Sequence, residues 1–167
     1  MASWPSVNGE AQRIQLEIPA RPEYIALARL VVSSLASGRR ALADDRIDDL
    51  KLAVSEACTN AIEAHADLDL EERVVLRWAD GEDRLEVHVE DRGEGFDPHD
   101  LPEHPPVTDP DRLNFERGLG IPLIRTLVDE VEFETSGTGT SVRLVMFCGP
   151  VDTEITGPAT GELWLDS

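Results

Sequence analysis

The sequence has no long hydrophobic run and no recognisable export signal. No apolar stretch approaches the roughly 20 residues that a membrane-spanning helix needs, so we expect no membrane insertion. Pro5, Asn8 and Glu10 stand where a secretory signal peptide would carry a basic start followed by an apolar stretch. We therefore expect the protein to be cytoplasmic.

Cysteines are also few. Cys58 and Cys148 are the only two in the chain, and they do not form the closely spaced pairs that are typical of metal sites. A reducing compartment would leave them as small buried hydrophobic side chains. We expect neither a disulfide nor a cysteine metal site.

Cationic residues are outnumbered by anionic ones. The chain has 15 lysines and arginines against 34 aspartates and glutamates, which gives a formal net charge of -19. Proteins that bind nucleic acid directly use Lys and Arg to neutralise phosphates, so this composition argues against a nucleic-acid partner. A protein partner with a basic surface fits the charge better.

The length and the remaining composition suit a single globular domain. The chain has 167 residues, of which 41% are hydrophobic and 29% are charged, both ordinary values. We expect an N-terminal extension at 1–11, a folded domain at 12–147 and an acidic C-terminal tail at 148–167. The proline-rich stretch 97–117 suits neither a helix nor a central strand, and we interpret it as a lid.

Two periodicities organise the domain. Alternation of apolar and polar residues, which is typical of half-buried strands, occurs at 13–18, 72–79, 84–91, 130–135 and 140–147. Helical spacing of apolar residues occurs at 23–36, at 44–66 and after the glycines 118 and 120. Glycine-containing turns join the strands at 72–91 and those at 130–147 into two predicted hairpins.

The helix at 44–66 carries the first candidate site residues. Its predicted apolar face consists of Ile47, Leu50, Val54, Ala57, Cys58, Ala61 and Ile62. Glu56 and Asn60 are neighbours one turn apart on the opposite face, so both side chains can reach one ligand. The plain alternative is a solvated polar face, since most charged helix positions do nothing specific. Two glycine motifs further along the chain favour the ligand site.

The first glycine motif is Asp91-Arg92-Gly93-Glu94-Gly95-Phe96, at the end of the strand 84–91. Gly93 and Gly95 allow the backbone to approach a flat ligand without a Cβ in the way. The carboxylate of Asp91 can accept a hydrogen bond from an exocyclic amine. A simple turn is the alternative interpretation of these residues.

The second glycine motif is Gly118-Leu119-Gly120, and it opens a helix. The unpaired N–H groups and the positive dipole end of that helix then face whatever the glycines approach, which suits phosphate oxygens. A carboxylate, an amide and two glycine segments in this order are the parts that hold Mg·ATP. The acidic total charge is no obstacle, since a Debye length of about 8 Å screens distant carboxylates.

Taken together, the motifs resemble the GHKL ATP-binding family, specifically its anti-sigma factor, serine-protein kinase branch (RsbW and SpoIIAB type). The resemblance covers about residues 12 to 147. Ser55–Ala61 matches the N box of the branch, Asp91–Phe96 its G1 box, Gly118–Gly120 its G2 box, and Gly139-Thr140 before Val142-Arg143-Leu144 its last box. The implied fold is α/β: a two-layer α+β sandwich of the Bergerat type, with a mixed, mainly antiparallel sheet of about five strands covered on one face by three helices.

The resemblance also implies roles for the site residues. Glu56 becomes the catalytic base, Asn60 a ligand of Mg²⁺, Asp91 the acceptor for the adenine amino group, and Thr140 a support for the adenine. The other nucleotide-binding residues are Gly93, Gly95, Arg117, Gly118, Leu119 and Gly120. Arg117 is placed to reach the γ-phosphate, with an exposed lid arginine as the alternative.

The implied activity is an ATP-dependent serine/threonine-protein kinase. A homodimer would sequester an RNA polymerase sigma factor, and would phosphorylate a STAS-domain anti-anti-sigma factor that competes for it. Two other functions stay open at this point. A nucleotide-gated binding module without kinase activity would use the same ATP-binding residues. A histidine-kinase-type ATPase domain would share the fold, but we expect no helical hairpin with a phosphoacceptor histidine before the domain in this chain.

Overall fold

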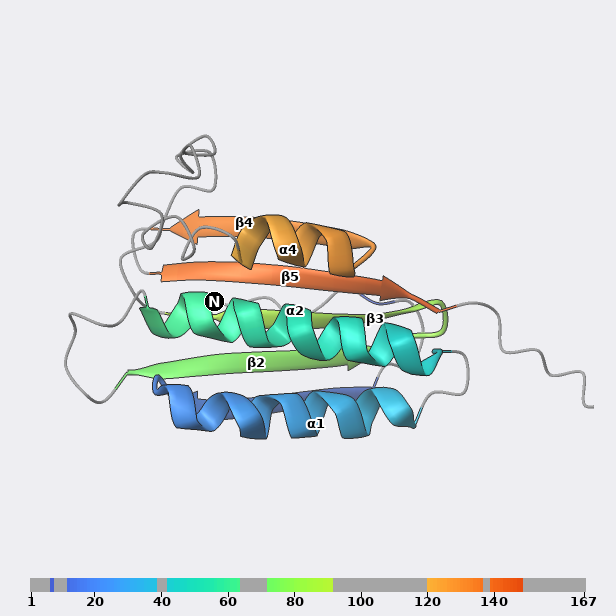
Figure 1. Cartoon of the computed structure of the whole chain (residues 1–167), viewed down its shortest axis with the longest axis horizontal. Helices are drawn as coiled ribbons and strands as arrows, with labels where there is room; N and C mark the ends of the chain where they lie inside the picture. Colours follow the sequence, from blue (N-terminus) through green and yellow to red (C-terminus); the bar gives the residue numbers. More distant parts are fainter. Residues whose placement is uncertain are drawn as a thin grey trace, which may run out of the picture.

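Five strands form one sheet, and the helices cover one of its faces (Figure 1). The computed structural model describes residues 7, 12–38, 42–63, 72–91, 120–136 and 139–148. The strands are β1 (Gln12–Pro19), β2 (Arg73–Asp80), β3 (Arg84–Glu90), β4 (Glu130–Ser136) and β5 (Gly139–Phe147). The helices of this part are α1 (Ile25–Ser37), α2 (Asp44–Glu63) and α4 (Gly120–Leu127), with a 3₁₀ turn, η1 (Pro22–Tyr24), before α1.

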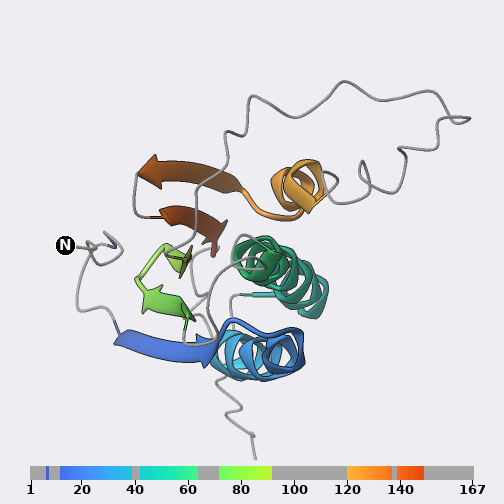
Figure 2. The same ribbon diagram turned by 90° about the vertical axis from the view of Figure 1, so that its left-hand side faces the viewer.

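The strand order across the sheet is β1-β2-β3-β5-β4, and all four pairings are antiparallel. Two hairpins, β2-β3 and β4-β5, meet where β3 pairs with β5. Figure 2, viewed from the end of the sheet, shows the three helices on one side of it. The predicted two-layer fold is therefore confirmed: the described part of the chain has five strands and three α-helices, and the described pairings are wholly antiparallel.

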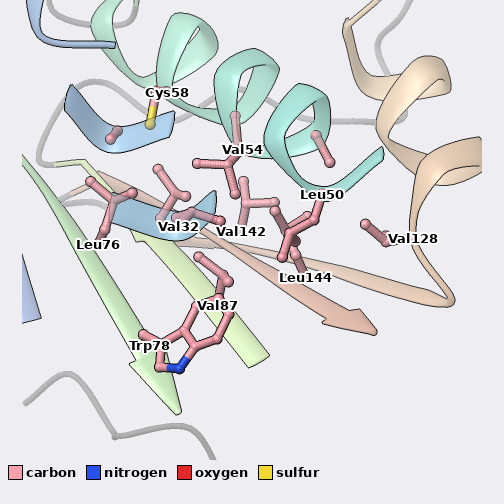
Figure 3. Close-up of a cluster of buried hydrophobic side chains, with 14 of the residues drawn as sticks. Val32, Leu50, Val54, Cys58, Leu76, Trp78, Val87, Val128, Val142 and Leu144 are labelled. Carbon is pink, nitrogen blue, oxygen red and sulfur yellow. The ribbon is translucent and has the colours of Figure 1, made fainter. Parts of the chain in front are cut away.

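The core lies between α2 and the sheet (Figure 3). Leu50, Val54 and Cys58 recur at intervals of four residues along α2 and point at the central strands. Val87 from β3 and Leu144 from β5 meet them from the sheet. The seven residues predicted for the apolar face of α2 are all buried. Burial at this spacing is what the helical period predicts, so α2 has its opposite face available for polar side chains.

The sequence predicted the elements well and some helix faces less well. Every predicted strand is present, and each of its ends lies within one residue of the predicted end. Leu27 and Leu30 of α1 and Leu123 of α4 are apolar but exposed. Three helices share one sheet, and the sheet offers each of them only a narrow strip of contact, so some apolar positions remain in solvent. The predicted last turn of α2, at 64–66, lies outside the described residues.

Both cysteines are buried thiols, as predicted. Cys58 points from α2 into the core, and Cys148 follows β5. Burial raises the pKa of the Cys58 thiol to about 12. The reactive thiolate is therefore scarce at neutral pH, and Cys58 acts as a small apolar group.

The open face of the sheet carries a network of charges around Glu86 of β3. The carboxylate of Glu86 is fully buried. It accepts hydrogen bonds from Arg143 Nε and Nη2, at 3.1 and 2.8 Å, and pairs with Arg84 Nε at 2.9 Å. Burial alone would raise the pKa of Glu86, but the hydrogen bonds and charge of Arg143, with Arg84, lower it below its usual value. This network covers the sheet face that lacks helices.

His88 sits in the middle of the same face and makes stability depend on pH. Burial lowers its pKa, and so does the charge of Arg143 across from it on β5, while Glu86 and Glu90 on β3 oppose the shift. Arg77 faces it from β2. The folded protein therefore favours neutral His88, whereas the unfolded chain binds a proton below a pH of about 6.5.

We expect the free energy of unfolding to fall as the pH is lowered from about 7 through 6, toward the depressed pKa of His88. In His88→Gln this part of the pH dependence should disappear, because glutamine does not titrate. Urea unfolding at pH 7.5 and 5.5 measures the difference. The pKa of Glu86 is depressed, so that group contributes to the pH dependence only at lower pH. An equal loss of stability in both proteins would contradict the assignment to His88.

Within the described ranges, no helix is long and apolar enough to cross a membrane.

Candidate functional site

Glu56 and Asn60 lie on the part of α2 that faces away from the core. Both side chains are half-buried, whereas Ala57, Cys58 and Ala61 between and beside them are buried. The two polar residues are one turn apart, so their side chains lie on the same side of the helix. The structure therefore keeps the pair together, as the sequence predicted.

Gly120, the first residue of α4, touches both of these side chains. The position that a Cβ would occupy at Gly120 is 3.0 Å from Glu56 Oε2 and 3.2 Å from Asn60 Oδ1. A real Cβ at 3.0 to 3.4 Å would force its neighbours aside. The N-terminus of α4 therefore comes against α2 just where the carboxylate and the amide are, and only glycine allows the contact without displacing them.

Asp91 and Thr140 form a second pair, where β3 ends and β5 begins. The N–H of Asp91 donates to the carbonyl oxygen of Thr140 at 2.9 Å, and the N–H of Thr140 donates to Asp91 Oδ1 at 3.3 Å. This reciprocal pairing fixes the aspartate at the edge of the core. Thr140 itself is only 3% exposed.

The two pairs lie at the same end of the molecule. In Figure 1 the C-terminal half of α2 is at the left, and β5, whose arrow points right, also begins there. Asp91 follows β3 at this end because Glu90 pairs with Ser141, next to Thr140. The structure thus collects Glu56, Asn60 and Gly120 in the helix layer and Asp91 and Thr140 at the adjoining end of the sheet.

Two buried polar atoms at this end have no hydrogen-bond partner among the described residues. They are Nδ2 of Asn60 and Oγ1 of Thr140. A buried unpaired donor costs about 1–3 kcal/mol, so such atoms are typical of places where a ligand or water completes the bonding. Their presence here, with a glycine contact that leaves the carboxylate and the amide unobstructed, fits a polar ligand such as Mg·ATP.

The remaining predicted site residues lie outside the described residues. They are Gly93, Gly95, Arg117, Gly118 and Leu119, together with the predicted lid at 97–117. Most of the predicted extension at 1–11 and of the predicted tail at 148–167 also lies outside, so these boundaries stay predictions. Among the described residues, no group of three or more His, Cys, Asp and Glu side chains forms a metal cluster.

The model of one protein family, the histidine kinase-like ATPase domain, matches residues 18–146. The chain belongs to this family. Among its curated relatives, the serine-protein kinase RsbW of Bacillus licheniformis is 41% identical over 82% of this chain and 86% of the relative. The serine-protein kinase RsbW of Bacillus subtilis is 40% identical over 84% of this chain and 89% of the relative.

A solved structure agrees with the fold. The crystal structure of the RsbU and RsbW domains of a Mycobacterium tuberculosis protein superposes with a TM-score of 0.59 at 19% sequence identity. The match covers 83% of this chain and 33% of the longer one. At this identity the likeness concerns the fold alone.

Family membership confirms the resemblance that the motifs carried. ATP use follows from it, and the predicted class of ATP-dependent serine/threonine-protein kinase of the RsbW type is confirmed at the level of the family. Sequence reasoning missed the direct contact of Gly120 with Glu56 and Asn60, since it treated the glycine only as a phosphate-binding loop. It also did not predict that Leu52 of α2 and Leu123 of α4 are exposed.

Proposed function

We propose that this chain transfers the γ-phosphate of Mg·ATP to a serine or threonine of a STAS-domain anti-anti-sigma factor. The observation that carries the proposal is the contact of Gly120 with Glu56 and Asn60. It joins the start of a helix, where N–H groups are unpaired, to a carboxylate and an amide. These are the groups that phosphoryl transfer needs around the reacting phosphate.

Each site residue has a part in this proposal. Asn60 holds Mg²⁺ through its side-chain oxygen, and its unpaired Nδ2 donates to a ligand oxygen. Mg²⁺ keeps several waters and is usually held by one or two protein groups plus phosphates, so a single amide oxygen can be the protein's contribution to its site. Bound Mg²⁺ would neutralise charge that develops on the phosphates.

Glu56 accepts the proton of the acceptor hydroxyl. A general base must lie within hydrogen-bond reach of the proton it takes, and Glu56 Oε2 is at the N-terminus of α4, where the phosphates would lie. Asp91 accepts a hydrogen bond from the adenine amino group, and Thr140 Oγ1 completes its own bonding in the same place. In this scheme Gly93 and Gly95 let the backbone approach the adenine, and Arg117 and Gly118 contact the phosphates.

The proposed cellular role is that of an anti-sigma factor. A homodimer holds an RNA polymerase sigma factor in the cytoplasm and releases it when the STAS-domain antagonist binds instead. Phosphorylation of that antagonist ends its binding and resets the switch. The net charge of -19 suits protein partners with basic surfaces.

Two measurements on the purified protein test this function. We expect saturable ATP binding that strengthens with Mg²⁺, measured by calorimetry, and transfer of phosphate from γ-labelled ATP to a purified STAS-domain protein of the same genome. The product should be a phosphoserine or phosphothreonine. If the protein binds ATP but transfers phosphate to no such protein, it is a nucleotide-gated binding module and not a kinase. If it does not bind ATP, the proposed nucleotide site is wrong.

A further inference from the structure

Leu52 and Leu123 are exposed leucines of the helix layer, 43% and 37% accessible to solvent. Leu52 belongs to α2 and Leu123 to α4, and the core-facing positions of these helices are occupied by other residues. Single exposed leucines are common on protein surfaces and need no explanation by themselves. The position of these two relative to Glu56 is what makes them informative.

Leu52 lies one turn before Glu56 on the same side of α2, since positions four apart are neighbours on a helix surface. It is thus the apolar residue next to the proposed base along that helix. No core residue covers it, because the buried face of α2 is on the other side of the helix.

Leu123 reaches the same place from α4. Gly120 faces α2 at Glu56 and Asn60, and Leu123 follows three residues later, which rotates it only about 60° away from Gly120 around the helix. Arg125, on the far side of α4, instead lies over the ring of Phe133 on β4, 5.4 Å from its centroid. Leu123 is therefore on the side of α4 that borders α2, and Figure 1 shows the two helices side by side.

On the described surface of α2 next to Leu52, Glu56 and Glu63 supply negative charge. No cationic side chain among the described residues pairs with Glu56 or Glu63, which share this side of α2. Lys51, the single lysine of the sequence, pairs with Asp48 at 2.7 Å. A partner that covers Leu52 and Leu123 must therefore present an apolar side chain to them. A cationic side chain on the same partner would complement Glu56 and Glu63.

We propose that Leu52 and Leu123 form a docking surface for the segment of the phosphate-accepting protein that carries its acceptor hydroxyl. This inference rests on the proposed function. The acceptor hydroxyl must come within hydrogen-bond reach of Glu56. An extended segment advances by up to about 3.5 Å per residue, so the residues of the acceptor one or two positions from its serine or threonine lie over the neighbouring turns of α2 and α4. The segment that fits has an apolar side chain next to its serine or threonine and a basic residue close by.

The test uses Leu52→Gln and Leu123→Gln, which keep the side-chain length and remove the apolar surface. We expect the Kd of the STAS-domain protein and its KM in phosphate transfer to rise about tenfold for each variant. The ATP affinity and the kcat at saturating acceptor should stay within about twofold. Leu52→Met should behave like the native protein, and Leu52→Arg should be weaker than Leu52→Gln because it repels a basic segment.

Phe147→Gln is the matched control, because Phe147 is also an exposed apolar side chain, 47% accessible, but lies at the end of β5, away from Glu56. It should leave both the Kd and the KM unchanged. Glutamine variants of both leucines that bind the STAS-domain protein as tightly as the native chain would overturn the docking surface. If the native chain binds that protein but transfers no phosphate, the kinase proposal fails, while a weaker Kd of the leucine variants still supports the surface.

Discussion

Replacing Glu56 with Gln should lower the rate of phosphate transfer by about 10²–10⁴-fold, the range that loss of a general base typically costs. Glutamine has nearly the same shape as glutamate, so it can keep the close contact with Gly120. It cannot accept the proton of the acceptor hydroxyl at neutral pH. Single-turnover transfer from γ-labelled ATP to the STAS-domain protein measures the chemical step directly.

Glu63→Gln provides the matched control for that experiment. Glu63 is on the same side of α2 and carries the same charge, but it is exposed at the end of the helix. At saturating STAS-domain protein we expect Glu63→Gln to transfer phosphate at the native rate, and both variants to bind ATP with near-native affinity. A native transfer rate in Glu56→Gln would remove this residue from the mechanism, and equal losses in both variants would indicate a general effect of charge.

The elements of the fold could be predicted from the sequence because each has a clear period. Val87 and Val89 alternate with polar neighbours along β3, and Leu50, Val54 and Cys58 recur at helical spacing along α2. These patterns are local in the sequence, and they predict the burial correctly because β3 and α2 each bury their apolar face in the core.

Side-chain environments on the open face of the sheet were less predictable. The alternation of β3 places Glu86 on the solvent side, yet its carboxylate is fully buried. Arg84 and Arg143 cover it, and Arg143 comes from a strand far away in the sequence. The two-residue period of a strand predicts the face on which a residue lies. Whether water reaches that residue depends on the long side chains of the neighbouring strands.

The candidate site divides in the same way. The pairing of Glu56 with Asn60 follows from helical geometry alone, and so was predictable. The pairing of Asp91 with Thr140 depends on the register of β3 against β5, and the contact of Gly120 with Glu56 depends on how α4 packs on α2. The order of the motifs predicts that these residues meet. The distances between them could not be predicted, because strand register and helix packing are properties of the whole fold.

Gly120→Ala should lower phosphate transfer by about 10–100-fold without loss of stability. A Cβ at this position would lie 3.0 Å from Glu56 Oε2 and 3.2 Å from Asn60 Oδ1, and both are ends of side chains that can move. Displacement of a reacting group by about 1 Å can cost about 10²-fold in rate. Gly120 has no positive φ, so alanine suits its backbone, and in a helix it is favoured over glycine by up to about 1 kcal/mol.

Gly38→Ala separates this effect from a general response to the added methyl group. Gly38 caps α1 in a helical conformation, and among the described residues its Cβ would meet the carbonyl oxygen of Leu35 alone, at 3.4 Å. We expect native transfer from this variant. Thermal unfolding of both alanine variants should match or exceed that of the native protein.

The double variant Glu56→Gln/Gly120→Ala then identifies the group through which Gly120 acts. If the alanine impairs transfer mainly by displacing the carboxylate of Glu56, it should add little to the loss already caused by Glu56→Gln, because residues that act together are not additive. If it acts mainly through Asn60, the losses should multiply and the dependence on Mg²⁺ should shift to higher concentration. Native transfer in the single variant Gly120→Ala would show that the contact has no part in the chemistry.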